Sequence, residues 1–96
     1  MAALRGEFAH RLDGEGHPVQ VPVQALKPGD LILVPPGARV GADGIVLEGR
    51  SDVGEALVTG ESLPRAVSAG DAVHAGSLNG TGALTLRVTA GGDQTL

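Results

Sequence analysis

The residues whose types and order could do chemistry are Thr59-Gly60-Glu61-Ser62, in a chain that has no cysteine. The Glu61 carboxylate can accept a hydrogen bond from a water molecule and orient it for attack. Thr59 and the unhindered backbone of Gly60 let such a loop approach a phosphate closely. The alternative interpretation is a surface turn, in which Gly60 supplies an unusual backbone angle, Ser62 caps and Glu61 is solvated. Four residues alone do not decide between the two.

Short β-branched segments, separated by many of the 16 glycines and six prolines, must position this loop. The pattern predicts an all-β domain, a small distorted jelly roll or β-sandwich with at most short helical turns. Strands are expected at Glu7–Leu12, Val19–Val23, Leu31–Val34, Ile45–Glu48, Ser51–Val53, Ala72–His74 and Ala83–Ala90.

Three of these segments carry specific expectations. Pro22 cannot donate a ladder hydrogen bond, so its strand should lie at a sheet edge, with Val19, Val21 and Val23 on one face. The apolar run Leu31–Val34 should be buried on both faces, whereas Ala83–Ala90 alternates and should bury its Leu and Val side chains. Lys27–Asp30 is expected to be a tight turn, and Glu55–Val58 a single helical turn before Thr59.

Composition excludes several classes of function. The seven Lys and Arg residues are scattered and the net charge is −4, so no basic stripe exists that could bind nucleic acid. The absence of cysteine excludes disulfides and thiolate metal sites. No Walker loop and no Gly-x-Gly-x-x-Gly sequence occurs, so nucleotide binding is not expected in this chain. Phe8 is the only aromatic residue, which predicts a core of small side chains and modest stability.

Other titratable residues have simpler interpretations. Asp30 and Asp43 are expected to accept hydrogen bonds from their own turns. His10, His17 and His74 have no paired spacing, so surface or turn positions are expected rather than a metal site.

The Thr59–Ser62 sequence stands inside a longer one, EALVTGESLP, from Glu55 to Pro64. The flanking sequences occur in a fixed order: Gly29-Asp30, Ala42-Asp43-Gly44, Gly70-Asp71 and Ala75-Gly76-Ser77-Leu78-Asn79. From about Val19 to Leu96, this ordered set resembles the actuator domain of a P-type ATPase. The sequences VLEGRS, from Val46, and AGSLNG, from Ala75, are most similar to the heavy-metal group, with bacterial copper exporters first and zinc, cadmium or lead exporters second.

The resemblance implies a role in hydrolysis of an aspartyl-phosphate intermediate, coupled to ion transport. Glu61, with Thr59 and Gly60, would promote dephosphorylation, and Ser62 and Glu55 would support the loop. No metal or cofactor site is implied here, because ATP and Mg²⁺ bind other domains of the pump. The implied partners are the phosphorylation and nucleotide-binding domains and the membrane helices of the same chain. The implied location is the cytosolic side of a membrane, in bacteria the inner one.

The whole chain, residues 1–96, is expected to be one actuator domain excised from a longer protein. Residues 1–6 and 91–96 would be linker ends toward membrane helices. We expect the isolated domain to be monomeric and inactive by itself, since only the full-length pump would be an enzyme.

The sequence departs from the family pattern at several positions. Gly54 and Ala56 stand where aspartate and serine are usual, which predicts looser bracing behind the loop. Gly41 replaces a proline, and Arg65-Ala66-Val67 lacks the charges that often follow the loop. Two other functions stay open: a non-catalytic β-sandwich interaction module, and a cupin-like metal enzyme, which would need histidines clustered on adjacent strands. The resemblance implies that the ion ligands, which select the transported cation, lie outside this chain.

Overall fold

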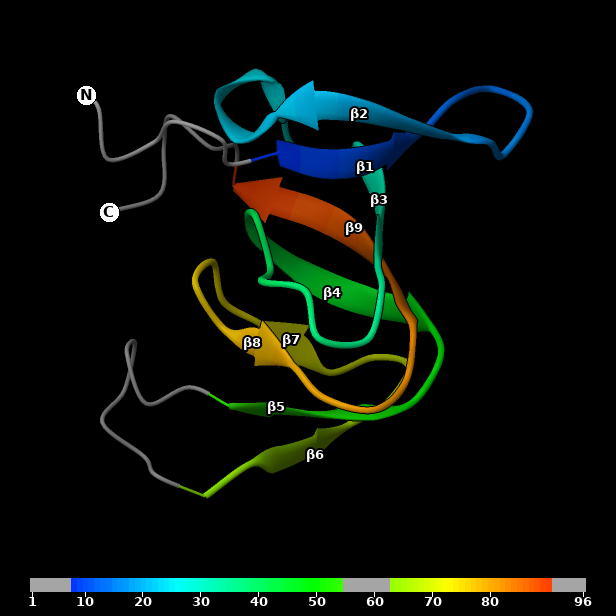
Figure 1. Ribbon diagram of the computed structural model, residues 1–96. Helices are drawn as coiled ribbons and strands as arrows, with labels where there is room; N and C mark the ends of the chain where they lie inside the picture. Colours follow the sequence, from blue (N-terminus) through cyan, green and yellow to red (C-terminus); the bar gives the residue numbers. More distant parts are fainter. Residues whose placement is uncertain (1–7, 55–62, 91–96) are drawn as a thin grey trace.

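The computed structural model describes residues 8–54 and 63–90, which form two antiparallel β-sheets (Figure 1). The larger sheet has the strand order β2-β1-β3-β9-β4-β7, and the smaller has the order β6-β5-β8. The expected all-β class is confirmed, and the helical structure among the described residues is a single 3-10 turn, η1 (Val23–Ala25). The strands are β1 Phe8–Leu12, β2 Pro18–Pro22, β3 Leu31–Val34, β4 Asp43–Glu48, β5 Ser51–Gly54, β6 Arg65–Val67, β7 Ala72–Val73, β8 Leu78–Asn79 and β9 Leu84–Ala90.

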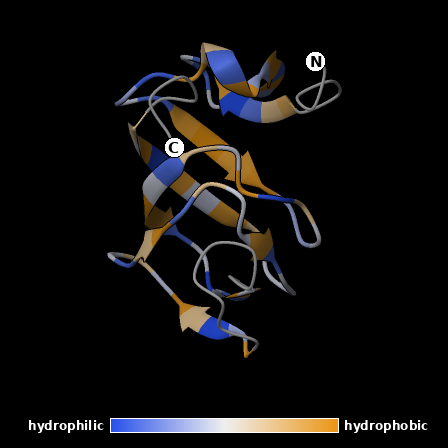
Figure 2. Ribbon diagram, turned by 90° about the vertical axis from the view of Figure 1, so that its left-hand side faces the viewer, coloured by the Kyte–Doolittle hydropathy of each residue, from blue (hydrophilic) through white to orange (hydrophobic). Residues whose placement is uncertain are grey.

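The core is built around β9, which pairs with β3 on one side and β4 on the other. Leu84, Leu86 and Val88 of β9 are buried, while Arg87 and Thr89 between and beyond them are exposed, as the alternation predicts. In Figure 2, hydrophobic and hydrophilic residues alternate along some strands, whereas a strand such as β3, with the sequence LILV, is hydrophobic throughout. The smaller sheet joins the same hydrophobic cluster through Val53 of β5 and Val67 of β6.

The first hairpin and the turn at residues 27–30 form as expected. Strand β2, which contains Pro22, lies at the edge of the larger sheet and, among the described strands, pairs only with β1. In the turn, the Asp30 N–H donates to the Lys27 carbonyl over 3.0 Å and Gly29 has a φ of 95°. A positive φ at the third position of a turn requires glycine or a residue of similar freedom, so Gly29 fits this site.

Three expectations about strands are wrong. Strand β3 is buried on one face only: Ile32 and Val34 are buried, but Leu31 is exposed. Successive side chains of a strand point to opposite faces of the sheet, so when only one face is covered by the core, every second side chain of β3 is buried. Val19 is likewise exposed although Val21 is buried, and Val23 belongs to η1 rather than to β2. Finally, the structure contains β6 and β8, which the sequence did not predict, because segments of two or three residues show no periodicity.

The described strands nearest to the chain ends and the strands that flank residues 55–62 belong to different sheets. Strands β1 and β9, the first and last of the described strands, both belong to the larger sheet. Figure 1 shows β1 and β2 at one end of the molecule and β5 and β6 at the other. The described residues include no helix with the length and hydrophobicity that a bilayer crossing requires.

Candidate functional site

The predicted site residues Glu55, Thr59, Gly60, Glu61 and Ser62 lie outside the described residues, as do Ala56, the helical turn expected at 55–58 and the linker ends expected at 1–6 and 91–96. The structure does describe the two strands that this segment joins. Strand β5 ends at Gly54 and β6 begins at Arg65, and the two pair antiparallel. The candidate loop is therefore attached at both ends to neighbouring strands of the smaller sheet.

Strand β5 is the central strand of that sheet, so its backbone is paired on both sides. Val53 lies opposite Arg65 of β6 and Asn79 of β8, and its side chain is fully buried. Ladder hydrogen bonds and the buried side chain of Val53 thus fix β5 one residue before it ends at Gly54.

A buried side-chain amide ties β5 to the larger sheet. The Ser51 hydroxyl donates to Asn79 Oδ1 over 2.6 Å. The Asn79 Nδ2 group donates to the carbonyls of Val34 and Pro35, each at 3.0 Å, and of Gly82 at 2.7 Å. Asn79 is 1% exposed. A buried amide with all its polar atoms bonded fixes the elements that it joins, because losing any partner leaves a desolvated group.

The turn after Asn79 lies in direct contact with β5 and the residue before it. The Gly80 N–H donates to the Asp52 carbonyl over 2.7 Å, and the Gly82 N–H donates to the Ser51 hydroxyl over 3.1 Å. A Cβ at Gly82 would collide with the Arg50 carbonyl oxygen. Glycine is needed here because only a backbone without side chains can approach so closely.

The two aspartates expected to bond their own turns behave differently. Asp30 does so, since its Oδ2 accepts the Lys27 N–H over 3.0 Å. Asp43 does not: it is the first residue of β4, and its Oδ1 accepts the N–H of Ala75, 32 residues away, over 2.8 Å. The expectation for Asp43 is wrong because that backbone donor from a distant loop lies within reach of the half-buried carboxylate.

The departures from the family pattern that the structure describes have distinct settings. Gly54 ends β5 without a left-handed backbone, and no described atom lies within 4 Å of a Cβ placed there. At Gly41 such a Cβ would lie 3.0 Å from Val23 Cγ1. The segment Arg65-Ala66-Val67 is β6 itself, and the Arg65 guanidinium donates to the Ala72 carbonyl over 2.8 Å.

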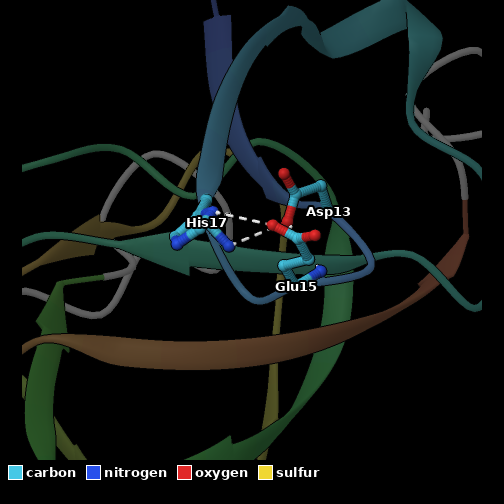
Figure 3. Close-up of polar contacts among 3 residues, drawn as sticks. All are labelled: Asp13, Glu15 and His17. Atoms are coloured by element: carbon cyan, nitrogen blue, oxygen red, sulfur yellow. Dashed lines mark hydrogen bonds and ion pairs between the residues drawn. The ribbon is translucent and has the colours of Figure 1, made fainter.

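The histidines lie apart: His10 in β1, His17 before β2 and His74 after β7. In the β1–β2 turn, Asp13 Oδ1 accepts the N–H groups of Glu15 and His17, each at 2.9 Å (Figure 3). His17 Nδ1 also lies 3.7 Å from Glu15 Oε1, between exposed side chains. Within residues 8–54 and 63–90, no group of three His, Cys, Asp or Glu side chains is arranged to hold a metal ion.

The bond between Ser51 and Asn79 is a part of the site that the sequence did not predict. One signal was present, because asparagine is depleted in strands and Asn79 ends the sequence Ala75–Asn79 used for the resemblance. Its partners, however, lie 28 to 45 residues away, apart from Gly82, and only the fold brings them together.

Comparison with known proteins decides the family. The model of the P-type ATPase actuator domain matches residues 3–96. This chain belongs to that family. The actuator domain is 45% identical over 96 residues to the nitrogen fixation protein FixI of Bradyrhizobium diazoefficiens, and 49% identical over 87 residues to the copper-exporting P-type ATPase B of Archaeoglobus fulgidus.

A solved structure agrees with this assignment. The actuator domain superposes on a crystal structure of a zinc-transporting PIB-type ATPase with a TM-score of 0.84 and 38% identity, covering 93% of this chain and 14% of that one. The two curated relatives above are covered over 13% and 12% of their length, and this chain is aligned over 100% and 91% of its own. The actuator domain thus corresponds to about an eighth of those relatives, and the resemblance stated from the sequence is confirmed.

Proposed function

We propose that this actuator domain drives hydrolysis of the aspartyl phosphate in a copper-translocating P-type ATPase, with Glu61 orienting the attacking water. The observation that carries the proposal is the match of the actuator-domain model over residues 3–96, which include Thr59-Gly60-Glu61-Ser62. The attachment of this segment to paired strands at both ends supports it, because a catalytic loop needs a firm base.

The chemistry requires an acceptor for a proton of the attacking water, in line with the phosphorus. Glu61 supplies the acceptor, and Thr59 and Gly60 give the loop close access to the phosphate. Ser62 and Glu55 support the loop. A carboxylate beside a phosphate experiences like-charge repulsion, so a separate domain that approaches for one step of the cycle suits this chemistry.

The other parts of the reaction belong to the remainder of the pump. ATP and Mg²⁺ bind the nucleotide-binding and phosphorylation domains of the same chain, and the ion ligands lie among its membrane helices. The actuator domain works on the cytosolic side of the membrane, which in a bacterium is the inner membrane. Its rotation couples dephosphorylation to opening of the ion path.

The heavy-metal group is supported by the names of the relatives, which include silver-exporting, cobalt/nickel-exporting and zinc-transporting ATPases beside the copper exporters. A zinc exporter is the second candidate. It is favoured by the superposition on a zinc-transporting ATPase and by 43% identity over 81 residues to the zinc-transporting ATPase of Bacillus subtilis. Measuring which cation, Cu(I) or Zn(II), stimulates phosphorylation of the full-length pump distinguishes them.

The test of the catalytic role is Glu61→Ala in the full-length pump. Phosphorylation from ATP should persist, while decay of the phosphoenzyme after a chase with unlabelled ATP should slow by about 10²–10⁴-fold, the usual contribution of a positioned general base. Glu48→Ala is the matched control, because Glu48 is an exposed carboxylate at the end of β4. Rapid decay in the Glu61→Ala pump would remove Glu61 from the mechanism and leave its loop as a turn.

A further inference from the structure

The junction between the two sheets contains a closed ring of hydrogen bonds. The Gly82 N–H donates to the Ser51 hydroxyl, this hydroxyl donates to Asn79 Oδ1, and Asn79 Nδ2 returns to the Gly82 carbonyl. Along the series from the Gly82 N–H through the Ser51 hydroxyl to the Asn79 amide, each group polarises the next, which strengthens these bonds relative to separate pairs. We call Ser51, Asn79 and Gly82 the junction ring.

The junction ring links elements from both sheets. Ser51 is the first residue of β5, in the smaller sheet. The Asn79 amide also donates to Val34, the last residue of β3, and to Pro35 after it. Strand β3 lies between β1 and β9 in the larger sheet. One side chain therefore connects the centre of the larger sheet to the start of β5.

This connection lies on the route from the chain ends to the candidate loop. Strands β1 and β9, which are nearest to the ends among the described strands, are both hydrogen-bonded to β3. Segment 55–62 joins β5 and β6 of the smaller sheet. A movement applied to the domain through its ends must cross from one sheet to the other before it reaches Glu61.

We propose that Ser51 and Asn79 are positioning residues that keep the smaller sheet, and with it Glu61, in a fixed orientation relative to the larger sheet. This inference rests on the proposed function of Glu61. When the ring is intact, rotation of the larger sheet carries the loop with it as one body. When the ring is opened, β5 loses its side-chain bond to Asn79 and keeps its ladder bonds, the bond from the Gly80 N–H to the Asp52 carbonyl and the burial of Val53. The loop then reaches the phosphate less accurately. A displacement near 1 Å can cost about 10²-fold in rate.

The test uses Ser51→Ala in the full-length pump, which removes one hydroxyl and opens the ring. Phosphorylation from ATP should be unchanged, and phosphoenzyme decay should slow by about tenfold. This is less than the effect of a displacement of about 1 Å, because β5 keeps its other bonds. Ser51→Thr keeps the hydroxyl on a β-branched side chain suited to a strand, so its phosphoenzyme should decay faster than that of Ser51→Ala. A merely structural role would not produce this split between phosphorylation and decay.

Val21→Ala is the stability control, because Val21 is buried in β2, which pairs with β1 at the far edge of the larger sheet. Normal decay in Ser51→Ala, or equal slowing in Val21→Ala, would overturn the inference. Ser51→Cys, a weaker donor, replaces Ser51→Ala if that pump is not phosphorylated at all, and normal decay there also overturns it. Glu61→Ala is measured in parallel: slow decay there with normal decay in Ser51→Ala rejects only the junction ring, whereas normal decay in Glu61→Ala rejects both proposals.

Discussion

The Asp43 carboxylate holds the loop that precedes β8, since its Oδ1 accepts the Ala75 N–H over 2.8 Å across 32 residues of sequence. We expect Asp43→Ala to lower the free energy of unfolding by about 1–2 kcal/mol, because a charge-assisted hydrogen bond is lost and a backbone donor is left without its acceptor. Urea denaturation of the domain measures this. Asp43→Asn is the control that keeps a neutral acceptor, and a loss as large as that of Asp43→Ala would show that the carboxylate charge, and not the bond, matters.

Two glycines, one at the end of β5 and one before it, should respond in opposite directions to alanine. At Gly54 the backbone is not left-handed and a Cβ meets no described atom within 4 Å, so Gly54→Ala should raise stability by about 0.4–1 kcal/mol by restricting the unfolded chain. Gly49 has a φ of 103°, and a Cβ there would collide with the Ala83 carbonyl oxygen. Gly49→Ala should therefore lower the thermal midpoint.

Gly54→Asp, which restores the residue usual in the family, should also raise the midpoint, but by less than Gly54→Ala. Aspartate restricts the unfolded chain as alanine does. It is, however, depleted in strands, and Gly54 of β5 is paired with Leu78 of β8. Thermal melts of the three proteins give the order directly. A midpoint below that of the unsubstituted domain for both Gly54 variants would show that the glycine backbone itself is required there.

The β1–β2 turn predicts a dependence of stability on pH. Hydrogen bonds from the His17 N–H and then the Glu15 N–H lower the pKa of Asp13 below its ordinary value. The folded state therefore prefers the carboxylate. The resulting stability is present above the pKa of the unfolded chain and is lost as the pH falls through the lower pKa of the folded state.

The comparison that isolates this effect is with Asp13→Asn, which keeps a side-chain acceptor but cannot ionise. The difference in thermal midpoint between the two proteins should be constant between about pH 7 and 5 and should shrink below about pH 4, near the ordinary pKa of aspartate. A difference that stays constant down to about pH 3 would show that ionisation of Asp13 does not contribute.

The sequence predicts the long elements because their own residues carry the signal. Strand β9 shows seven residues of alternation, and the turn at Gly29 has the proline and glycine that its backbone requires. Strands β6 and β8 carry no such signal, since each has only two or three residues and forms by pairing with β5. The bond of Asp43 to Ala75 and the ring of Ser51 and Asn79 depend on contacts distant in sequence, which no local pattern encodes.

The function was predicted from the order of short motifs along the chain and not from local periodicity, which predicts the strands. Thr59-Gly60-Glu61-Ser62 indicates hydrolysis only within the ordered set of surrounding sequences, and the family assignment confirms that set. The geometry of these four residues lies outside the described part of the chain, so the role of Glu61 stays a prediction for the phosphoenzyme experiment.

Two serines, Ser51 in β5 and Ser77 directly before β8, give the sharpest test of the hydrogen bonds described above. The Ser77 hydroxyl is fully buried and has no hydrogen-bond partner among the described residues. A buried hydroxyl without a partner costs about 1–3 kcal/mol in proteins, so Ser77→Ala should raise the free energy of unfolding by about 1 kcal/mol.

Ser51→Ala should have the opposite sign. The Ser51 hydroxyl donates to Asn79 Oδ1 and accepts the Gly82 N–H, so its removal leaves two polar groups without that partner and should lower the free energy of unfolding by about 1–2 kcal/mol. Both variants make the same chemical change, and urea denaturation of the two compares them directly. The double variant should equal the sum of the singles, because the two hydroxyls share no hydrogen bond among the described residues. A stabilising Ser51→Ala would mean that the junction ring does not hold β5, whereas a destabilising Ser77→Ala would reveal a bond to Ser77 that forms in solution.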